Sequence, residues 1–433
     1  MNVQTMLDPI RLLCLADLHL GRSSSPLPEE LIPNQFTPRA VWEEIVKYAL
    51  AIENKIDAVL LCGDVVDQDD LFFEIFRVFE KGVQALIEAK IPLIAVAGNH
   101  DATVFRKLAQ TLSSPFFHLL GKEGKWESLS LALNNRIVRF DGWSFPQNHV
   151  PYNPLHRYQG DLSSIQTADT IIGLLHCDCP GSALSRYAPV KVQDFINLPP
   201  QVWVLGHIHK PTVLNQNPLV FYCGSPQGLD VGENGDHGAH LLEILPNQEP
   251  KKTFLSFAKI RWEHLHFSIA QVNAENFEEK IIQELSSLHA SISKNSPFLQ
   301  TVGCRLTLTG RHPAYQQIPS FIHKMVNRVI FSSDSVEYFI EHVENRTQPP
   351  YDLQHLSELA DPAGLLAKQL IDLENNRPGT DALLQSARLR LASMQEKYPP
   401  FSAAEISDDK LKVWLLQAGY QALDLLLSQK EKE

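Results

Sequence analysis

Leu15-Ala-Asp-Leu-His-Leu-Gly21 joins the end of a short apolar run to two side chains of metal-ligand type, Asp17 and His19. Side chains two positions apart in an extended chain project to the same side, so both can reach one site. Four later segments repeat this design, with an apolar run that ends in Asp, Asn or His: Cys62-Gly-Asp-Val-Val-Asp67, Ala97-Gly-Asn-His-Asp101, Leu175-His-Cys-Asp178 and Leu205-Gly-His-Ile-His-Lys210.

The pattern around these segments predicts how the strands are arranged. Apolar runs at 12–16, 58–62 and 93–97 alternate with amphipathic segments that begin at Pro38 and cover 71–89. Fully apolar strands that alternate with helices indicate a parallel sheet that is covered on both faces. In such sheets ligands bind beyond the carboxyl ends of the strands. We therefore expect the five segments to meet at one site, although they span nearly 200 residues.

The side chains in these segments indicate the kind of site. Carboxylates, imidazoles and one amide suit Mn, Fe or Zn, and a carboxylate such as Asp64 can bridge two ions. Each segment alone has an ordinary explanation: Gly-Asp is typical of a turn, Asn-His-Asp of a helix cap, and His-x-His of a solvated strand face. All five together, each at the end of an apolar strand, favour a metal site.

The five motifs in this order resemble the calcineurin-like metallophosphoesterase superfamily. Asp-Leu-His-Leu-Gly, the chain length and the segments at 142–147 and 224–238 are similar to its DNA-repair nuclease branch, the SbcD-like and YhaO-type proteins. The resemblance implies a four-layer αββα sandwich that binds two divalent ions, with Mn expected and Fe or Zn as alternatives. It assigns the metal ligands Asp17, His19, Asp64, Asn99, His176, His207 and His209, with His100 as the catalytic histidine and Asp67 orienting it.

In this assignment one ion contacts Asp17, His19, the bridging Asp64 and His209. The other contacts Asp64, Asn99, His176 and His207. Asp101 has a simpler expected role, as the cap of a helix that starts near Val104. Cys177 and Cys179 are spaced like metal ligands, but the sequence has no second cysteine pair to complete a zinc site.

The rest of the chain predicts two further domains. We expect the nuclease domain at 1–262, a small α+β capping domain at 263–345 and a helical segment at 346–433. Pro349-Pro350 predicts a linker at 345–350. The last helix, 408–430, carries a leucine stripe (Leu411, Leu415, Leu416, Leu423, Leu426 and Leu427). This stripe either packs on the capping domain or docks on a partner.

Composition limits the functional classes. No apolar run is long enough to cross a membrane, and the N-terminus lacks a signal-peptide pattern. We therefore expect a soluble cytoplasmic protein with six reduced cysteines. The formal net charge of −12 argues against a generally basic DNA-binding surface. DNA-backbone contacts would have to be local, and the candidates are Arg22, Arg157, Arg186 and Lys210.

These observations and the resemblance predict a Mn-dependent DNA exonuclease and endonuclease, the nuclease subunit of an SbcCD-like complex in DNA repair and recombination. The expected partners are DNA and an SMC-like coiled-coil ATPase of the SbcC/YhaN type, and a homodimer is compatible with the sequence. Two alternatives stay open. One is a phosphatase or small-molecule phosphodiesterase with the same chemistry, and the other is a non-catalytic scaffold subunit.

Overall fold

The computed structural model describes residues 8–67, 72–158, 168–182, 184–312, 318–348, 351–395 and 406–430. The chain forms two compact units. The first comprises Met1–His264, Ile282–Arg305 and Val326–His342, and the second comprises Leu265–Ile281, Leu306–Met325 and Val343–Glu433. The predicted domain boundaries at 262/263 and 345/346 stay predictions.

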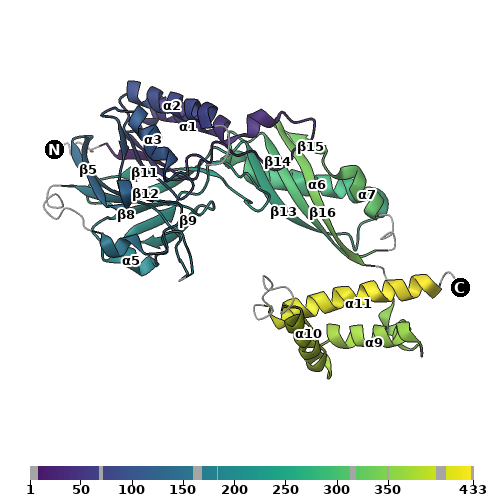
Figure 1. Ribbon diagram of the computed structural model, residues 1–433. Helices are drawn as coiled ribbons and strands as arrows, with labels where there is room; N and C mark the ends of the chain where they lie inside the picture. Colours follow the sequence, from purple (N-terminus) through teal and green to yellow (C-terminus); the bar gives the residue numbers. More distant parts are fainter. Residues whose placement is uncertain are drawn as a thin grey trace, which may run out of the picture. The chain divides into compact units, whose positions relative to one another are not determined.

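Two six-stranded sheets form the centre of the first unit (Figure 1). Sheet A has the order β12-β11-β1-β2-β3-β4, and sheet B has the order β5-β6-β7-β8-β10-β9. The strands of sheet A are β1 (Ile10–Leu15), β2 (Ala58–Cys62), β3 (Leu93–Val96), β4 (Phe117–Leu119), β11 (Gly238–Ile244) and β12 (Lys251–Ser256). Those of sheet B are β5 (Glu127–Leu133), β6 (Arg136–Trp143), β7 (Thr170–His176), β8 (Val202–Gly206), β9 (Thr212–Gln216) and β10 (Leu219–Tyr222).

Parallel pairing places the carboxyl ends of the motif strands together. β1, β2 and β3 are parallel neighbours in sheet A, and β7 and β8 are parallel neighbours in sheet B. Each of these strands is followed directly by one of the five motif segments. The structure therefore explains why segments that are distant in sequence reach one site.

Alternation along the strands produces the layers. In β1, Leu13 and Leu15 belong to the core beneath the helices, while Leu12 and Cys14 belong to the core between the two sheets. β8 alternates in the same way, with Val204 between the sheets and Trp203 on the outer face of sheet B. Strands that are buried on both faces are continuously apolar for this reason.

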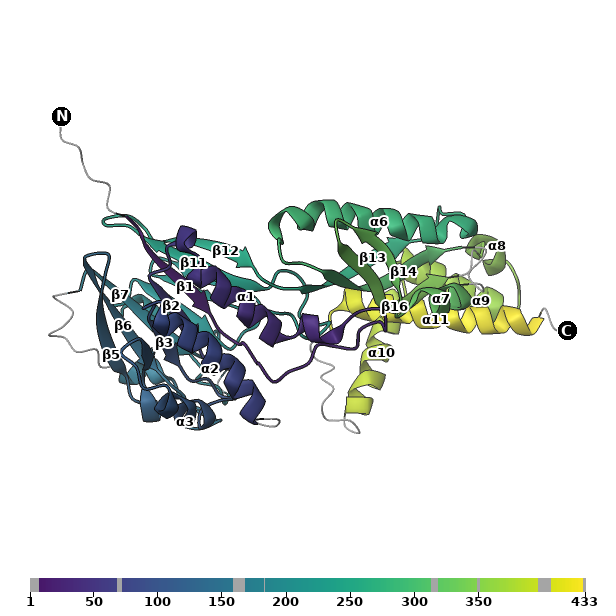
Figure 2. The same ribbon diagram turned by 90° about the horizontal axis from the view of Figure 1, so that it is seen from above.

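Helices cover the outer faces. α1 (Pro38–Leu50), α2 (Phe72–Glu88) and α3 (Val104–Thr111) pack on sheet A, and the short α5 (Val192–Ile196) lies on sheet B (Figures 1 and 2). Thr37 caps α1 by accepting a hydrogen bond from the Ala40 N–H group, and Pro38 occupies the first helical position, as predicted. The four-layer αββα sandwich is confirmed.

A third sheet of four strands has the order β13-β14-β16-β15. Its strands are β13 (Ile260–Ser268), β14 (Thr301–Arg311), β15 (Val329–Ser333) and β16 (Val336–Gln348), and its helices are α6 (Phe277–Ile292) and α7 (Ile318–Met325). The sequence pattern missed β15. The predicted linker was wrong for 345–348, because β16 continues to Gln348, whose carbonyl accepts a hydrogen bond from the His312 N–H group. Pro349-Pro350 lies outside the described residues.

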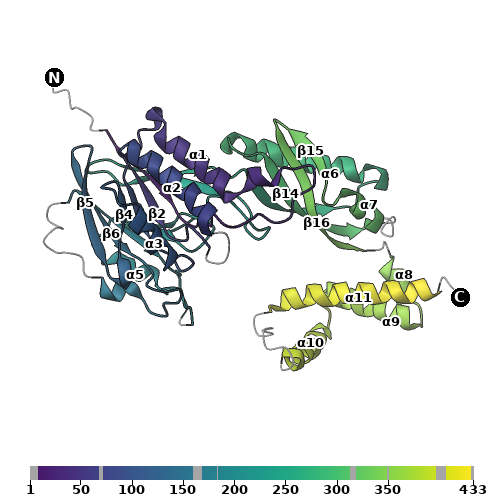
Figure 3. The same cartoon turned by 45° about the horizontal axis from the view of Figure 1, so that its top comes forward.

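The C-terminal helices are α8 (Leu353–Ser357), α9 (Pro362–Glu374), α10 (Thr380–Gln395) and α11 (Asp408–Lys430). α11 runs along α9 (Figure 3). Leu411 and Leu423 of the stripe are buried, and Leu423, Leu416, Leu426 and Leu427 pack in one cluster with Ala367, Leu370 and Tyr420. α9 thus packs against Leu416, Leu423, Leu426 and Leu427 of the stripe, and docking of the stripe on a partner stays a prediction.

We expect Leu423→Asp to unfold this helical segment, with a cost of more than about 3 kcal/mol, because it removes a buried leucine and buries a carboxylate without a partner. Limited proteolysis should then cut α9 and α11. Leu425 lies on the same helix but is 66% exposed, so Leu425→Asp is the matched control. Equal protease resistance of both variants would contradict this packing.

Within the part of the chain that the structure describes, every helix is too short or too polar to serve as a membrane span.

Candidate metal centre

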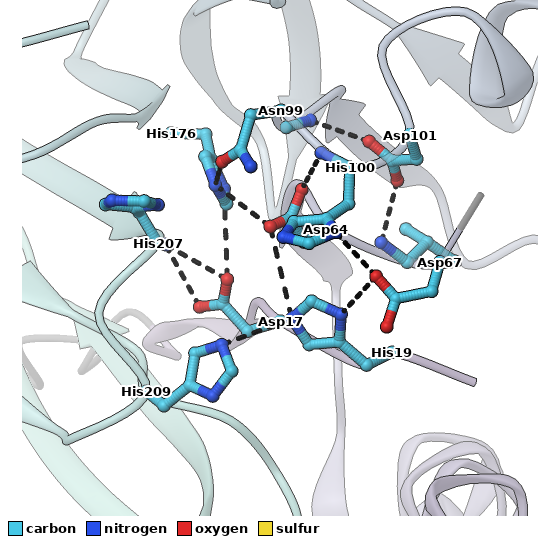
Figure 4. Close-up of polar contacts among 12 residues, drawn as sticks. Asp17, His19, Asp64, Asp67, Asn99, His100, Asp101, His176, His207 and His209 are labelled. Carbon is cyan, nitrogen blue, oxygen red and sulfur yellow. Dashed lines mark hydrogen bonds and ion pairs between the residues drawn. The ribbon is translucent and has the colours of Figure 1, made fainter. Parts of the chain in front are cut away.

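All nine residues that the sequence predicts for the site come together at the carboxyl ends of β1, β2, β3, β7 and β8 (Figure 4). Sheet A contributes Asp17, His19, Asp64, Asp67, Asn99 and His100, and sheet B contributes His176, His207 and His209. The site therefore depends on how the two sheets pack against each other, as well as on the five motifs.

One group of ligand atoms comes from Asp17, His19 and His209. The Nε2 atoms of His19 and His209 lie 3.1 Å apart. Two imidazole nitrogens that face each other at this distance can share a proton or direct their lone pairs at a shared cation. The donor set, one carboxylate and two imidazoles, is typical of a transition-metal site.

A second group comes from Asp17, Asp64 and His176. His176 Nε2 lies 3.0 Å from Asn99 Oδ1 and 3.3 Å from Asp64 Oδ2. The same Oδ2 atom of Asp64 is 4.0 Å from His19 Nε2. Asp64 thus lies between the two groups, which is the position that a bridging carboxylate needs.

His207 lies beside the second group, and its part as a ligand stays a prediction. Its ring is 5.3 Å from the ring of His176, centroid to centroid. Its backbone N–H group donates to both carboxylate oxygens of Asp17, at 3.0 and 3.1 Å. The motif of β8 therefore also fixes the carboxylate that follows β1.

The backbone is held in an unusual conformation at these positions. Asp17, His19, Asp64 and His207 all have positive φ angles, of 52°, 44°, 52° and 105°. Such angles are uncommon outside glycine and occur where the surrounding structure enforces them, often at functional sites. Glycine is required at 63, where φ is 86° and a Cβ atom would lie 2.6 Å from Nδ1 of His176.

The charges of the cluster also fit a cation. Burial opposes ionisation of Asp64, but the neighbouring His176 and His19 outweigh it, so the pKa of Asp64 lies well below its usual range. Burial likewise opposes protonation of His176, yet the carboxylates of Asp64 and Asp17 raise its pKa to about 9. A proton is thus held among buried carboxylates where a divalent ion can take its place.

His100 and Asp67 form a separate pair at the rim. His100 Nδ1 donates to Asp67 Oδ1 at 2.6 Å, and this hydrogen bond raises the pKa of His100. The side chain of His100 is 40% exposed, whereas that of His19 is 1% exposed. Arg22 Nε donates to the other oxygen of Asp67 at 2.5 Å. Arg22 is therefore held at the rim of the site through Nε, and its contact with a DNA backbone stays a prediction.

The expected role of Asp101 was wrong. α3 begins at Val104 with Thr103 at its N-cap position and no side-chain cap. The buried carboxylate of Asp101 instead accepts hydrogen bonds from the N–H groups of Val65 (2.7 Å) and Gly98 (2.8 Å). It ties the loop after β2 to the loop after β3. Local sequence suggests a cap because it shows no sign of a partner 36 residues away.

We expect Asp101→Ala to destabilise the first unit, because it leaves two buried N–H groups without acceptors, at about 1–3 kcal/mol each. The urea midpoint of the metal-free protein should fall clearly. Asp101→Asn keeps one amide oxygen and should lose less. An unchanged midpoint for the alanine variant would show that these two hydrogen bonds do not hold the loops.

The remaining predicted residues are not members of the candidate ligand groups found among the described residues. Arg157 stacks over the ring of Tyr152 at 4.8 Å, Arg186 is exposed, and Lys210 lines an open cavity of about 440 Å³ with Lys252. Cys177 and Cys179 are buried thiols, and burial raises both pKa values, that of Cys179 to about 12. A raised thiol pKa disfavours the thiolate that a metal needs.

Glu233 is a site residue that the sequence pattern did not reveal. It follows β10, and its Oε1 atom accepts a hydrogen bond from His209 Nδ1 at 2.6 Å. In the sequence, Glu233 is marked only by its place in a glycine-containing segment after Gly232, and that segment predicted no role for it.

The geometry defines a candidate centre for divalent metal ions, and comparison with known proteins gives its family. Residues 10–211 match the calcineurin-like phosphoesterase family, so this part of the chain is a calcineurin-like metallophosphoesterase domain.

Three relatives cover much of the chain. It is 26% identical to the uncharacterized metallophosphoesterase YhaO of Bacillus subtilis (strain 168), over 72% of this chain and 74% of that protein. It is 22% identical to the DNA double-strand break repair protein Mre11 of Thermoplasma acidophilum, over 66% of this chain and 74% of that one. The Mre11 of Methanopyrus kandleri is 21% identical over 63% of this chain and 61% of its own length.

Proposed function

We propose that the protein hydrolyses phosphodiester bonds in DNA with two divalent ions, Mn being the preferred metal, as the nuclease subunit of a DNA-repair complex. The observation that supports hydrolysis is the convergence of carboxylate, amide and imidazole ligands around Asp64. The similarity to two proteins named as DNA double-strand break repair proteins supports DNA as the substrate.

The site residues would perform three tasks. Asp17, His19 and His209 would hold one ion and Asn99, His176 and His207 the other, with Asp64 between them. When bound, such ions lower the pKa of water and neutralise phosphate oxygens. His100, whose pKa Asp67 raises, holds a proton that it can donate to the leaving oxygen. Asp67 orients the imidazole of His100 through Nδ1, which leaves Nε2 for the substrate.

The decisive experiment compares substrates. Linear duplex DNA, single-stranded DNA, an aryl phosphate and a cyclic nucleotide are incubated with the metal-stripped protein and added Mn²⁺. We expect release of nucleotides from DNA and little turnover of the small esters. A much higher kcat/KM for the small esters would contradict the proposal.

The charge of the chain favours a second candidate, a phosphatase or small-molecule phosphodiesterase. A formal net charge of −12 repels DNA, and Arg22 at the rim is already paired with Asp67. The same four-substrate assay distinguishes the two. Ionic strength gives a further test, because DNA cleavage should weaken as salt rises far more than cleavage of a small ester.

A coiled-coil ATPase partner is part of the main proposal. Apolar side chains exposed on the C-terminal helices are candidate contacts: Leu389, Met394, Val413, Trp414 and Leu425. Leu411 and Leu423 of the leucine stripe are buried and are not candidates. Loss of co-purification with the ATPase in a Trp414→Asp variant, with hydrolysis intact, is the expected result. Retained co-purification would exclude this surface.

We also infer a reducing, cytoplasmic setting. All six cysteines are free and buried, as expected of a protein that folds without disulfides.

A further inference from the structure

The imidazole of His209 is held from outside the five motifs. Its Nε2 atom faces His19 across the first ligand group, at 3.1 Å, and its Nδ1 atom donates to Glu233 Oε1 at 2.6 Å. Glu233 lies beyond residues 10–211, which match the family. The side chains of both residues are largely buried, with 22% of His209 and 18% of Glu233 exposed.

A closed circuit of hydrogen bonds connects His209 to the loop 225–237. The Ser225 N–H group donates to the His209 carbonyl at 2.9 Å. Nδ1 of His237 lies within hydrogen-bond distance of the Ser225 hydroxyl (2.9 Å) and of the Ser225 carbonyl (3.0 Å). Nε2 of His237 in turn donates to the Glu233 carbonyl at 3.0 Å, and the Glu233 carboxylate accepts from the His209 ring. Backbone and ring of His209 are thus held by the same loop.

His176, another proposed ligand, is also hydrogen-bonded at Nδ1, but to a different partner. His176 donates from Nδ1 to the carbonyl of Cys62 at 2.9 Å, which leaves Nε2 for Asp64 and Asn99. A hydrogen bond at one ring nitrogen fixes the tautomer and directs the lone pair of the other toward a metal. A carboxylate at that place also makes the ligand nitrogen more basic.

We propose that Glu233 is a positioning residue that fixes His209 for metal binding, with the loop 225–237 as a clamp around this ligand. The inference rests on the proposed metal-dependent function, but it concerns ion affinity and not the substrate. A purely structural role is the competing explanation, because Glu233 Oε2 also accepts a hydrogen bond from the Leu229 N–H group at 2.9 Å.

The test measures metal affinity and stability separately on the full chain. Mn²⁺ is titrated calorimetrically into the metal-stripped parent, Glu233→Ala, Glu233→Gln and the control Asp230→Ala. Asp230 lies in the same loop and accepts a hydrogen bond from the Gly232 N–H group, and among the described residues its carboxylate has no hydrogen bond to His209. Melting temperatures of the metal-free proteins are recorded beside the titrations.

Glu233→Ala is expected to weaken Mn²⁺ binding about 10–100-fold, the usual effect of losing such an outer partner, with a metal-free melting temperature close to that of Asp230→Ala. Glu233→Gln keeps an acceptor for the His209 Nδ1–H group and should lose less affinity. Asp230→Ala should bind Mn²⁺ like the parent.

Three results would overturn the clamp: parental affinity in Glu233→Ala, an equal loss in Asp230→Ala, or equally weak binding by the glutamine and alanine variants. A parent that binds no Mn²⁺ would overturn the proposed function as well. A parent that binds Mn²⁺ and loses affinity as expected, but does not cleave DNA, would support the clamp and contradict only the proposed substrate.

Discussion

Asp64→Asn is expected to reduce the rate of hydrolysis at least ~10⁴-fold, because it removes the charge from the carboxylate between the two ligand groups. Asp64 Oδ2 lies 3.3 Å from Nε2 of His176 and 4.0 Å from Nε2 of His19. An amide has one good ligand oxygen and no charge, so it cannot bridge two cations. We expect a larger loss than the ~10²–10⁴-fold that removal of a general acid costs.

Metal analysis provides the independent measurement. The parent should bind about two Mn²⁺ per chain, and the variant should bind fewer than one. The substitution preserves the side-chain volume. It also keeps an acceptor for the backbone N–H group of His100, which donates to Asp64 Oδ1 at 2.9 Å. Asp178→Asn is a matched control, since Asp178 lies outside the ligand groups found among the described residues. Full metal content in Asp64→Asn would show that this carboxylate does not bridge.

His100→Ala should reduce kcat by about 10²–10⁴-fold and leave the metal content unchanged. His100 is on the rim, 40% exposed, and hydrogen-bonded to Asp67. Its loss removes a proton donor and one edge-to-face contact with the ring of His19, at 5.2 Å between centroids, and the protein should remain folded because His100 lies at the rim. The measurement is turnover of the substrate that the four-substrate assay selects, with metal content determined on the same sample.

The structure offers a clear alternative for this residue. His19, Asp67 and His100 also lie close enough to form a ligand group of their own. If His100→Ala loses metal in proportion to activity, His100 is a ligand and not an acid. Unchanged turnover would contradict both roles.

The site residues were predictable because the family motifs name residue types at strand ends. Asp17 and His19 follow β1, and His207 and His209 follow β8, each pair two positions apart. The motifs did not predict which group hydrogen-bonds the second ring nitrogen of each site histidine. For His209 that partner is Glu233, 24 residues away, in a loop whose glycines and acidic residues also suit any ordinary turn.

The local sequence pattern did not reveal two long-range partners, and the reason is the same in both cases. Asp101 has the local signature of a helix cap, but its carboxylate bonds the loop after β2. The leucines of α11 have the spacing of an apolar face, which predicts that something covers them without saying what. The structure places α9 there. In both cases the short-range pattern is compatible with several long-range partners.

The apolar strand pattern by itself determined a parallel sheet covered on both faces, because strands buried on both faces must be continuously apolar, while the four-layer αββα arrangement was implied by the resemblance of the five motifs. The sequence also determined the chemical kind of the site, because ligand types are side-chain identities. The tertiary structure alone decided which atoms meet. The distance from Asp64 to both His19 and His176, the tie made by Asp101 and the clamp on His209 depend on how two sheets and their loops pack. Such packing contacts join residues far apart in the chain, and local spacing carries no record of them.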